Sequence, residues 1–278
     1  MRTGRKKKRP KIIGLPDFWD VLSRHENKLL ALDYDGTLAP FCVQRMQAYP
    51  YPGIPGALER IHRRADTVLA IISGRPLAEV LILAGPFNGI LIGSHGMEKQ
   101  LSSGDIVIKT VDQTQRQGLA CAQSAAEEIG LQHHIELKPA SVALHTRGIS
   151  PKEAARLEDL TVRIWHDISS RHGLEVRRFN GGVEVRATGW NKGDALEELR
   201  RGMPAGSACV YIGDDDTDED AFLKIRSRGY GIRVGDADRH TAARGLLPGI
   251  PAVREFLETW ADLTLPVLEE GISWIRDG

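Results

Sequence analysis

Two short apolar segments, far apart in the chain, each end in a cluster of aspartates. Residues 28–32 precede the sequence DYDGT at 33–37, and residues 208–212 precede the sequence GDDDTD at 213–218. Both apolar segments have the length and composition of buried strands. In open α/β sheets, ligands bind outside the carboxyl ends of the strands. The chain is therefore predicted to fold around a sheet with both acidic clusters at its ligand-binding edge.

Strands and helices alternate around both acidic clusters. Such alternation is typical of parallel βαβ units. The predicted strands are 28–32, 67–72, 89–93, 208–212 and 230–234, and the predicted helices are 55–64, 76–83, 192–201, 217–225 and 253–260. We therefore expect an α/β core with a Rossmann-like parallel sheet.

A different pattern interrupts this core between residues 103 and 187. It runs helix, two strands, helix, two strands, which is typical of an α+β module with an antiparallel sheet. The predicted elements are helices 113–129 and 151–171, strands 134–138 and 142–145, and a hairpin of 174–179 and 183–186. The expected domains are a basic tail and lead-in (1–27), a first core segment (28–102), an inserted α+β cap (103–187) and a second core segment (188–278).

The charge balance and hydropathy restrict the classes of partner. Lys plus Arg number 37, as do Asp plus Glu, so bulk charge gives no sign of a nucleic-acid partner. No apolar segment reaches the roughly 18 residues that a membrane span requires. The basic residues 2–11 are not followed by the apolar stretch of a secretory signal. They form either a solvated tail or a contact for an anionic surface or a targeting receptor.

The cysteines indicate the compartment. Cys42, Cys121 and Cys209 are far apart and form no CxxC pattern, which is typical of reduced thiols in an intracellular protein. We expect a cytoplasmic protein without membrane or nucleic-acid partners. The sequence does not determine the oligomeric state, and a monomer is the default expectation.

The acidic clusters predict a metal site. Several carboxylates at one sheet edge repel one another unless a cation lies between them. Mg²⁺ prefers hard oxygen ligands and usually shares its coordination with a substrate phosphate. The alternative is that the aspartates form surface turns and helix caps, with Asp216 or Thr217 capping the following helix. Because both clusters directly follow buried strands, a magnesium site is the preferred interpretation.

A phosphate site is predicted close to these carboxylates. Ser73, Gly74 and Arg75 lie between a strand and a helix, where a hydroxyl, backbone amides and a helix N-terminus can bind an anion. Lys192, just inside another helix, adds a compact positive charge. Each signal is weak alone, but beside the acidic clusters they predict a phosphate ester as the substrate.

These segments together resemble the haloacid dehalogenase superfamily of phosphatases. Its four signatures occur in order, as residues 33–37, Ser73, Lys192 and residues 213–215, and the inserted module resembles the superfamily's larger cap. Within the superfamily, the chain is most similar to trehalose-6-phosphate phosphatases. The similar segments are LDYDGTLAP (32–40), GSHG (93–96), ELK (136–138), HTR (145–147), EVR (184–186) and GDDDTDEDAF (213–222). One difference is Ala187, which stands where that family usually has proline.

The resemblance implies a magnesium-dependent sugar-phosphate phosphatase. Asp33 is the implied nucleophile, which forms a phospho-aspartate and is kept ionised by Mg²⁺ and Lys192. Asp35 is the implied general acid, which protonates the leaving sugar oxygen and then deprotonates a water molecule. This role needs a raised pKa for Asp35, and a neighbouring carboxylate is expected to raise it.

The remaining core residues receive roles from the same resemblance. The implied metal ligands are Asp33, Asp35 through its backbone carbonyl, and the side chain of Asp214. Asp215 and Asp218 are expected to hold metal-bound waters and the catalytic lysine. The residues expected to bind the phosphate, besides Lys192, are Thr37, Ser73, Gly74 and Arg75.

The cap is expected to recognise the sugar and to open and close over the site. The resemblance puts three charged residues of the predicted cap strands over the substrate: Glu136, Lys138 and Glu184. The alternative is that these are solvent-exposed strand charges. His145 and Arg147 are further candidates for substrate binding, whereas His95 either contacts the substrate or orders its loop.

Other functions on the same scaffold remain open. A phosphatase of sucrose 6-phosphate or of a glycosyl-phosphoglycerate would share the core and differ in the cap. A phosphomutase would retain the phosphate and need a bisphosphate activator. A non-catalytic sugar-phosphate sensor is disfavoured because Asp33, Asp35, Lys192 and Asp214 are all present.

Overall fold

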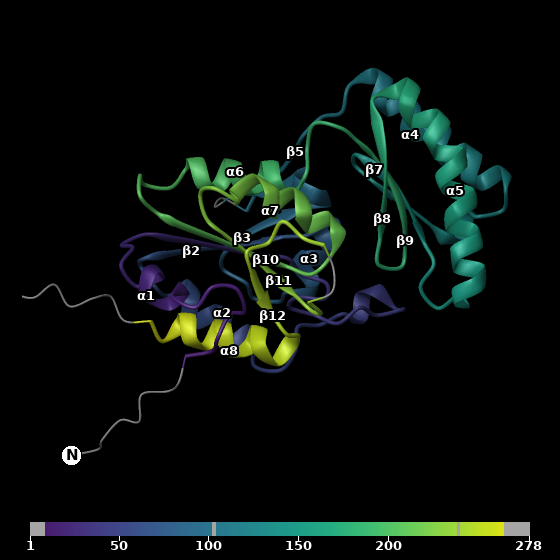
Figure 1. Ribbon diagram of the computed structural model, residues 1–278. Coiled ribbons are helices and arrows are strands. Elements are labelled where there is room, and N and C mark those ends of the chain that lie inside the picture. Colours follow the sequence, from purple (N-terminus) through teal and green to yellow (C-terminus); the bar gives the residue numbers. More distant parts are fainter. Residues whose placement is uncertain (1–8, 102–103, 238–239, 264–278) are drawn as a thin grey trace, which may run out of the picture.

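An α/β core with a smaller α+β unit beside it makes up the described residues of the chain (Figure 1). The computed structural model describes residues 9–101, 104–237 and 240–263. The core sheet has the strand order β12-β11-β10-β1-β2-β3-β4-β5. Its antiparallel strands at one end are β4 (Glu98–Gln100) and β5 (Ile106–Ile108). Its parallel strands are β1 (Lys28–Leu32), β2 (Thr67–Ile72), β3 (Ile90–Gly93), β10 (Ala208–Gly213), β11 (Tyr230–Val234) and β12 (Gly245–Leu247).

The register of the central strands brings the two acidic clusters together. Leu32, the last residue of β1, pairs with Ile212 of β10 in a parallel ladder. Asp33, which follows Leu32, and Asp214, which follows the last residue of β10, therefore leave the sheet at the same edge. The predicted parallel sheet and the predicted position of the clusters are both confirmed.

Helices cover both faces of the core sheet, as the alternation of side chains in β1 requires. Leu30 and Leu32 belong to one apolar cluster, and Leu29 and Ala31 belong to another. The helices packed in the first cluster are α1 (Phe18–Leu22), α2 (Ile54–His62), α3 (Leu77–Leu83) and α8 (Ile250–Ala261). The helices packed in the second are α6 (Lys192–Arg201) and α7 (Glu219–Ile225).

The smaller unit is an antiparallel sheet covered on one face by two helices (Figure 1). Its strand order is β6-β7-β9-β8, and its elements are α4 (Gln113–Glu128), β6 (Ile135–Lys138), β7 (Ser141–His145), α5 (Pro151–His172), β8 (Leu174–Phe179) and β9 (Gly182–Ala187). Asp112 forms a capping box at the start of α4, and Ser150 caps α5. Gly173 ends α5 in the left-handed conformation, with φ of 62°.

Several short elements differ from the prediction. Helix α1 and strands β4 (Glu98–Gln100), β5 (Ile106–Ile108) and β12 were not predicted, because segments this short show no clear period. Strand β5 pairs with β4 in the core sheet, although its residues were assigned to the cap. We therefore propose that the inserted unit begins after Ile108. The predicted start at Ser103 and residues 1–8 of the basic tail lie outside the described residues.

No helix within the described ranges combines the length and the apolar character that crossing a bilayer requires.

Candidate active site

The predicted nucleophile and the predicted lysine form the buried centre of the site. The amide of Asp33 donates to the carbonyl of Ile212 at 2.8 Å, which holds the loop against β10. Lys192 begins α6, whose N-cap is Asn191, and its Nζ lies 2.7 Å from Asp33 Oδ1 and 2.7 Å from Asp218 Oδ1. The two carboxylates raise the pKa of Lys192, against the effect of its burial. Lys192 is therefore charged and tied to the nucleophile.

Three carboxylates converge beside this lysine. Oxygen atoms of Asp33, Asp214 and Asp218 lie within 4.8 Å of one another. Burial, followed by repulsion from Asp218, raises the pKa of Asp33 to about 8. Burial, followed by repulsion from Asp33, raises the pKa of Asp214 to about 9. Since Asp214 Oδ1 is buried without a partner among the described residues, this group of oxygens fits a divalent cation.

Asp218 organises the second acidic loop. Its Oδ1 accepts from the hydroxyl of Tyr211 at 2.6 Å, and its Oδ2 accepts from the amides of Asp214 and Asp215 at 3.0 Å each. Asp218 is the N-cap residue of α7, and Asp215 caps the 3-10 turn that precedes this helix, so the prediction of Asp216 or Thr217 as the cap is wrong. The reason is that the turn starts one residue earlier, with Asp218 and Asp215 bonding reciprocally to each other's backbone.

Asp35 has a partner that the sequence did not suggest. Arg75 Nε lies 2.6 Å from Asp35 Oδ2, and its Nη2 lies 2.6 Å from Asp35 Oδ1, which is a bidentate ion pair. The group bonded to Asp35 is therefore a cation, although the carboxylate of Asp33 lies near it as expected. The other donor of Arg75, Nη1, contacts the carbonyl of Arg45 at 2.8 Å and Glu79 at 3.3 Å. Arg75 is thus bonded to Asp35, and its role as a phosphate ligand stays a prediction.

The other predicted phosphate-binding residues surround the same loop. Ser73 is buried, and its hydroxyl accepts from the amide of Arg75 at 3.1 Å. Thr37 Oγ1 is buried and has no hydrogen-bond partner among the described residues. Gly36 has φ of +79°, and a Cβ there would lie 2.2 Å from Asp214 Oδ2. Only glycine lets the two acidic loops approach this closely.

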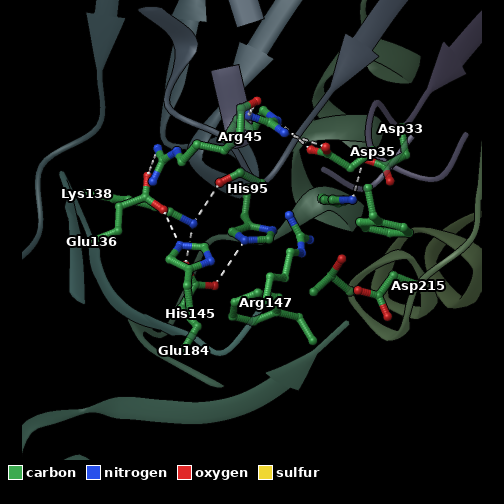
Figure 2. A pocket seen from close by; sticks show the side chains of 16 residues that line it. Asp33, Asp35, Arg45, His95, Glu136, Lys138, His145, Arg147, Glu184 and Asp215 are labelled. Atoms are coloured by element: carbon green, nitrogen blue, oxygen red, sulfur yellow. Dashed lines mark hydrogen bonds and ion pairs between the residues drawn. The ribbon is translucent and has the colours of Figure 1, made fainter. Parts of the chain in front are cut away.

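A cavity separates these core residues from the cap sheet (Figure 2). Its empty space amounts to about 610 Å³, a figure that includes space open to solvent. The predicted residues that line it are Asp33, Asp35, Gly74, Arg75, Glu136, Lys138, His145, Arg147, Glu184, Lys192 and Asp215. The predicted residues outside its lining are Thr37, Ser73, Asp214 and Asp218. Unpredicted lining comes from Phe41, Arg45, Phe179 and Thr217, and from His95, which had two possible roles.

Basic side chains from both the cap and the core contact Glu136. His145 Nε2 lies 2.6 Å from its Oε2, and Arg45, from the core, bonds its Oε1. Burial disfavours the charged form of Glu136, but the His145 hydrogen bond, Lys138 and Arg45 together lower its pKa to about 2. Glu136 is thus an ionised acceptor at the wall of the cavity.

Glu184 is the most enclosed carboxylate of the cap. It accepts from Lys138 Nζ at 2.8 Å and from the hydroxyl of Ser141 at 2.8 Å, and His95 Nε2 lies 3.0 Å from its Oε2. Although burial opposes ionisation, Lys138 and His95 hold the pKa of Glu184 well below its usual range.

Ser94 and His95 both have positive φ, 46° and 55°, a conformation that costs energy and often marks functional sites.

Polar contacts across the gap hold the cap against the core. Lys138 Nζ donates to the carbonyl of Gly74 at 2.9 Å. On the opposite side, Arg186 Nη2 of the cap contacts Asp220 Oδ2 of the core at 2.9 Å. These contacts, with those of His95 and Arg45, join the inserted unit to the core around the cavity.

Arg147 joins the cap hairpin to the core loop. Its guanidinium lies 4.8 Å from the ring centroid of Phe41, and its Nη2 donates to the carbonyl of Asn180 at 3.0 Å. The amide of Asn180 in turn donates to Asp215 Oδ2 at 3.1 Å. No sequence signal pointed to Phe41, because it lies in an irregular segment without a motif of its own.

Comparisons with known proteins agree with this geometry. The family model of trehalose-phosphatases matches residues 31–246. A probable trehalose-phosphate phosphatase of Sinorhizobium fredii is 32% identical over 256 residues, covering 90% of this chain and 94% of the relative. The trehalose-6-phosphate phosphatase of Escherichia coli is 30% identical over 240 residues, covering 81% of this chain and 84% of the relative.

Solved structures share the fold. The C-terminal domain of C. albicans trehalose-6-phosphate phosphatase superposes with a TM-score of 0.80 at 23% identity, covering 92% of this chain and all of that one. A haloacid dehalogenase-like hydrolase from Bacteroides thetaiotaomicron superposes with a TM-score of 0.58 at 19% identity, covering 84% of this chain and 99% of that one. With the family match over most of its length, the chain belongs to the trehalose-phosphatase family, and it shares the fold of a haloacid dehalogenase-like hydrolase.

Proposed function

We propose that this protein hydrolyses trehalose 6-phosphate to trehalose and phosphate, with Mg²⁺ and a phosphorylated Asp33. The observation that carries the proposal is the cavity that Asp33 and Lys192 share with the charged cap residues Glu136, Lys138 and Glu184. The end of the cavity that holds Asp33 and Lys192 suits a phosphoryl group, because the charge of Lys192 offsets the negative charge of the phosphoryl oxygens. The ionised glutamates and the lysine at the other end suit the hydroxyls of a sugar.

The reaction follows from the residues around Asp33. A carboxylate oxygen of Asp33 forms a bond to phosphorus while the bond from phosphorus to the sugar oxygen breaks. Asp35 gives its proton to that oxygen and later takes one from the water that attacks the phospho-aspartate, which releases phosphate and restores Asp33. Lys192 and the hydroxyl of Thr37 stabilise charge on the phosphoryl oxygens.

The metal and the ion pair of Asp35 complete this account. Asp33, Asp214 and the backbone of Asp35 would hold Mg²⁺, which when bound neutralises the carboxylates and polarises the phosphoryl group. Asp35 must take up a proton and turn from Arg75 toward the sugar oxygen before it can act as the acid. Arg75 is therefore proposed to hold Asp35 in place between turnovers.

Release of phosphate from a panel of sugar phosphates, with and without Mg²⁺, tests the proposal. The panel contains trehalose 6-phosphate, sucrose 6-phosphate, a glycosyl-phosphoglycerate and glucose 6-phosphate. We expect Mg²⁺-dependent turnover that is fastest for trehalose 6-phosphate and needs no bisphosphate activator. A clear preference for another sugar phosphate would overturn the substrate assignment.

A variant pair tests the nucleophile in the same assay. Asp33→Asn should abolish turnover while the protein keeps its far-ultraviolet circular dichroism. The matched control is Asp159→Asn, on the outer helix α5, where the carboxylate side chain is 65% exposed. The control should retain full activity, and substantial activity in Asp33→Asn would exclude the phospho-aspartate mechanism.

A further inference from the structure

Strand β5 presents an exposed apolar edge at one end of the core sheet. It is the last strand in the sheet order, and among the described residues its only strand partner is β4. The exposed fractions of Ile106, Val107 and Ile108 are 46%, 46% and 51%. Soluble proteins usually protect sheet edges with charges, proline or a bulge, and these three positions carry none of them. Such an edge is suited to pairing with another strand.

The ladder to β4 shows which backbone groups of β5 point outward. The amide of Lys109 donates to the carbonyl of Met97 at 2.8 Å, and the carbonyl of Asp105 accepts from the amide of Leu101 at 2.8 Å. Bonding positions alternate in an antiparallel ladder. The N–H and C=O groups of residues 105, 107 and 109 therefore face β4, and those of Ile106 and Ile108 face away from it.

We infer that β5 pairs antiparallel with β5 of a second copy of this chain, about a two-fold axis at Val107. The sequence of residues 105–109, DIVIK, complements itself in this register. Val107 lies opposite Val107 of the partner subunit, and Asp105 lies opposite Lys109 of the partner subunit. Since the two-fold axis repeats each contact, both charge pairs form at once.

The backbone geometry agrees with this register. Ile106 lies opposite Ile108 of the partner subunit, so the outward N–H and C=O groups of these two residues bond each other reciprocally. Val107 then occupies the non-hydrogen-bonded position on the axis, where side chains approach most closely. The side-chain pattern and the outward-facing backbone groups thus both specify the register centred on Val107.

Lys109 is held on the side of the strand where the partner's aspartate would lie. Its Nζ lies 2.9 Å from Glu198 Oε2 and 3.5 Å from the centroid of the Trp190 ring. Asp105, Val107 and Lys109 share one face of the strand because side chains alternate. An ammonium group carries three donors, so Lys109 can bond a second carboxylate without losing Glu198.

Sedimentation velocity over a concentration series tests the pairing. The parent chain of 30.6 kDa should shift toward twice that mass as the concentration rises, because a pairing this short gives a concentration-dependent dimer. Val107→Lys and Val107→Glu each place like charges opposite one another on the axis, so each alone should remain a monomer. Their equimolar mixture should dimerise again, because lysine then faces glutamate.

Variants at two other positions, Leu223 and Ile106, separate pairing from a general loss of apolar surface. Leu223→Lys and Leu223→Glu change a residue that is 59% exposed on α7. Helix α7 packs on β10 and β11, which several strands separate from β5, so these variants should dimerise like the parent. Ile106→Pro removes an outward N–H without removing a bond to β4, and should abolish dimers. Circular dichroism and phosphatase activity establish that each variant is folded.

The inference is overturned by any of three results. A parent chain that remains monomeric up to about 1 mM would exclude the interface. Val107 variants that dimerise as well as the parent would place the contact elsewhere. A mixture of the two Val107 variants that stays monomeric, while the parent dimerises, would exclude the two-fold register.

Discussion

Lys138 makes one of the contacts that join the cap to the core beside the cavity. Its Nζ donates to the core carbonyl of Gly74 at 2.9 Å and to the cap carboxylate of Glu184 at 2.8 Å, and its side chain is only 7% exposed. Lys138→Met keeps most of the apolar stem and removes the charge and both hydrogen bonds. Glu184 would then keep Ser141 and His95 as partners.

The size of the effect follows from the bonds lost. A hydrogen bond that involves a charged group contributes about 1.5–3 kcal/mol. If closure over the sugar depends on one such bond, kcat/KM for trehalose 6-phosphate should fall about 10- to 150-fold, since about 1.4 kcal/mol corresponds to a factor of ten. The small ester p-nitrophenyl phosphate needs no sugar recognition, so its kcat/KM should change little.

The assay compares both substrates in the variant and in a matched control. Arg156→Met removes an ion pair with Glu153 on the exposed surface of the cap helix α5, where the side chains are 62% and 45% exposed. Exposed pairs of this kind contribute little, so the control should behave like the parent. An equal loss with both substrates, or no loss with either, would refute a role of Lys138 in closing the cap over sugar.

Two other substitutions test the close approach of the acidic loops and the ion pairs of Asp66, which directly precedes β2. Gly36→Ala would place a Cβ 2.2 Å from Asp214 Oδ2, at a φ of +79°. The Mg²⁺ concentration for half-maximal activity should therefore rise at least tenfold. An unchanged Mg²⁺ concentration for half-maximal activity would contradict the close approach of the two acidic loops. Burial opposes ionisation of Asp66, but hydrogen bonds from Arg64 and Lys28 lower its pKa from 3.8 to about 2. This depressed pKa stabilises the fold by about 2 kcal/mol above pH 4, and the contribution is lost as the pH falls toward 2. Urea unfolding should therefore show a lower free energy of unfolding for Asp66→Asn than for the parent at pH 7, and this difference should become smaller as the pH falls. A difference that stays constant with pH would contradict the stabilising role of ionised Asp66.

The core of the site could be predicted because its residues follow strands directly. Asp33 and Asp214 each come after a buried apolar run, and parallel strands bring their carboxyl ends to one edge. Ser73 and Lys192 lie at strand–helix junctions that carry recognisable local signals. Such residues are positioned by short-range pattern and sheet topology, which a single sequence contains.

The contacts between units could not be predicted in the same way. Arg45 bonds Glu136 across the gap, and Arg75 turns toward Asp35, because of how distant segments pack. Neither contact leaves a periodic or local signal in the chain. The three-residue strands β4, β5 and β12 were missed for a related reason, since long-range pairing defines them more than their own composition.

The dependence of turnover on a divalent cation tests the central claim, that Asp33 and Asp214 share one ion beside the bound ester. Phosphate release from trehalose 6-phosphate is measured in excess chelator and then during titration with Mg²⁺, for the parent and for Asp214→Asn. The account predicts no turnover in chelator, recovery on adding Mg²⁺, and a much higher Mg²⁺ requirement in the variant. Undiminished turnover in excess chelator, or an unchanged requirement in Asp214→Asn, would contradict it.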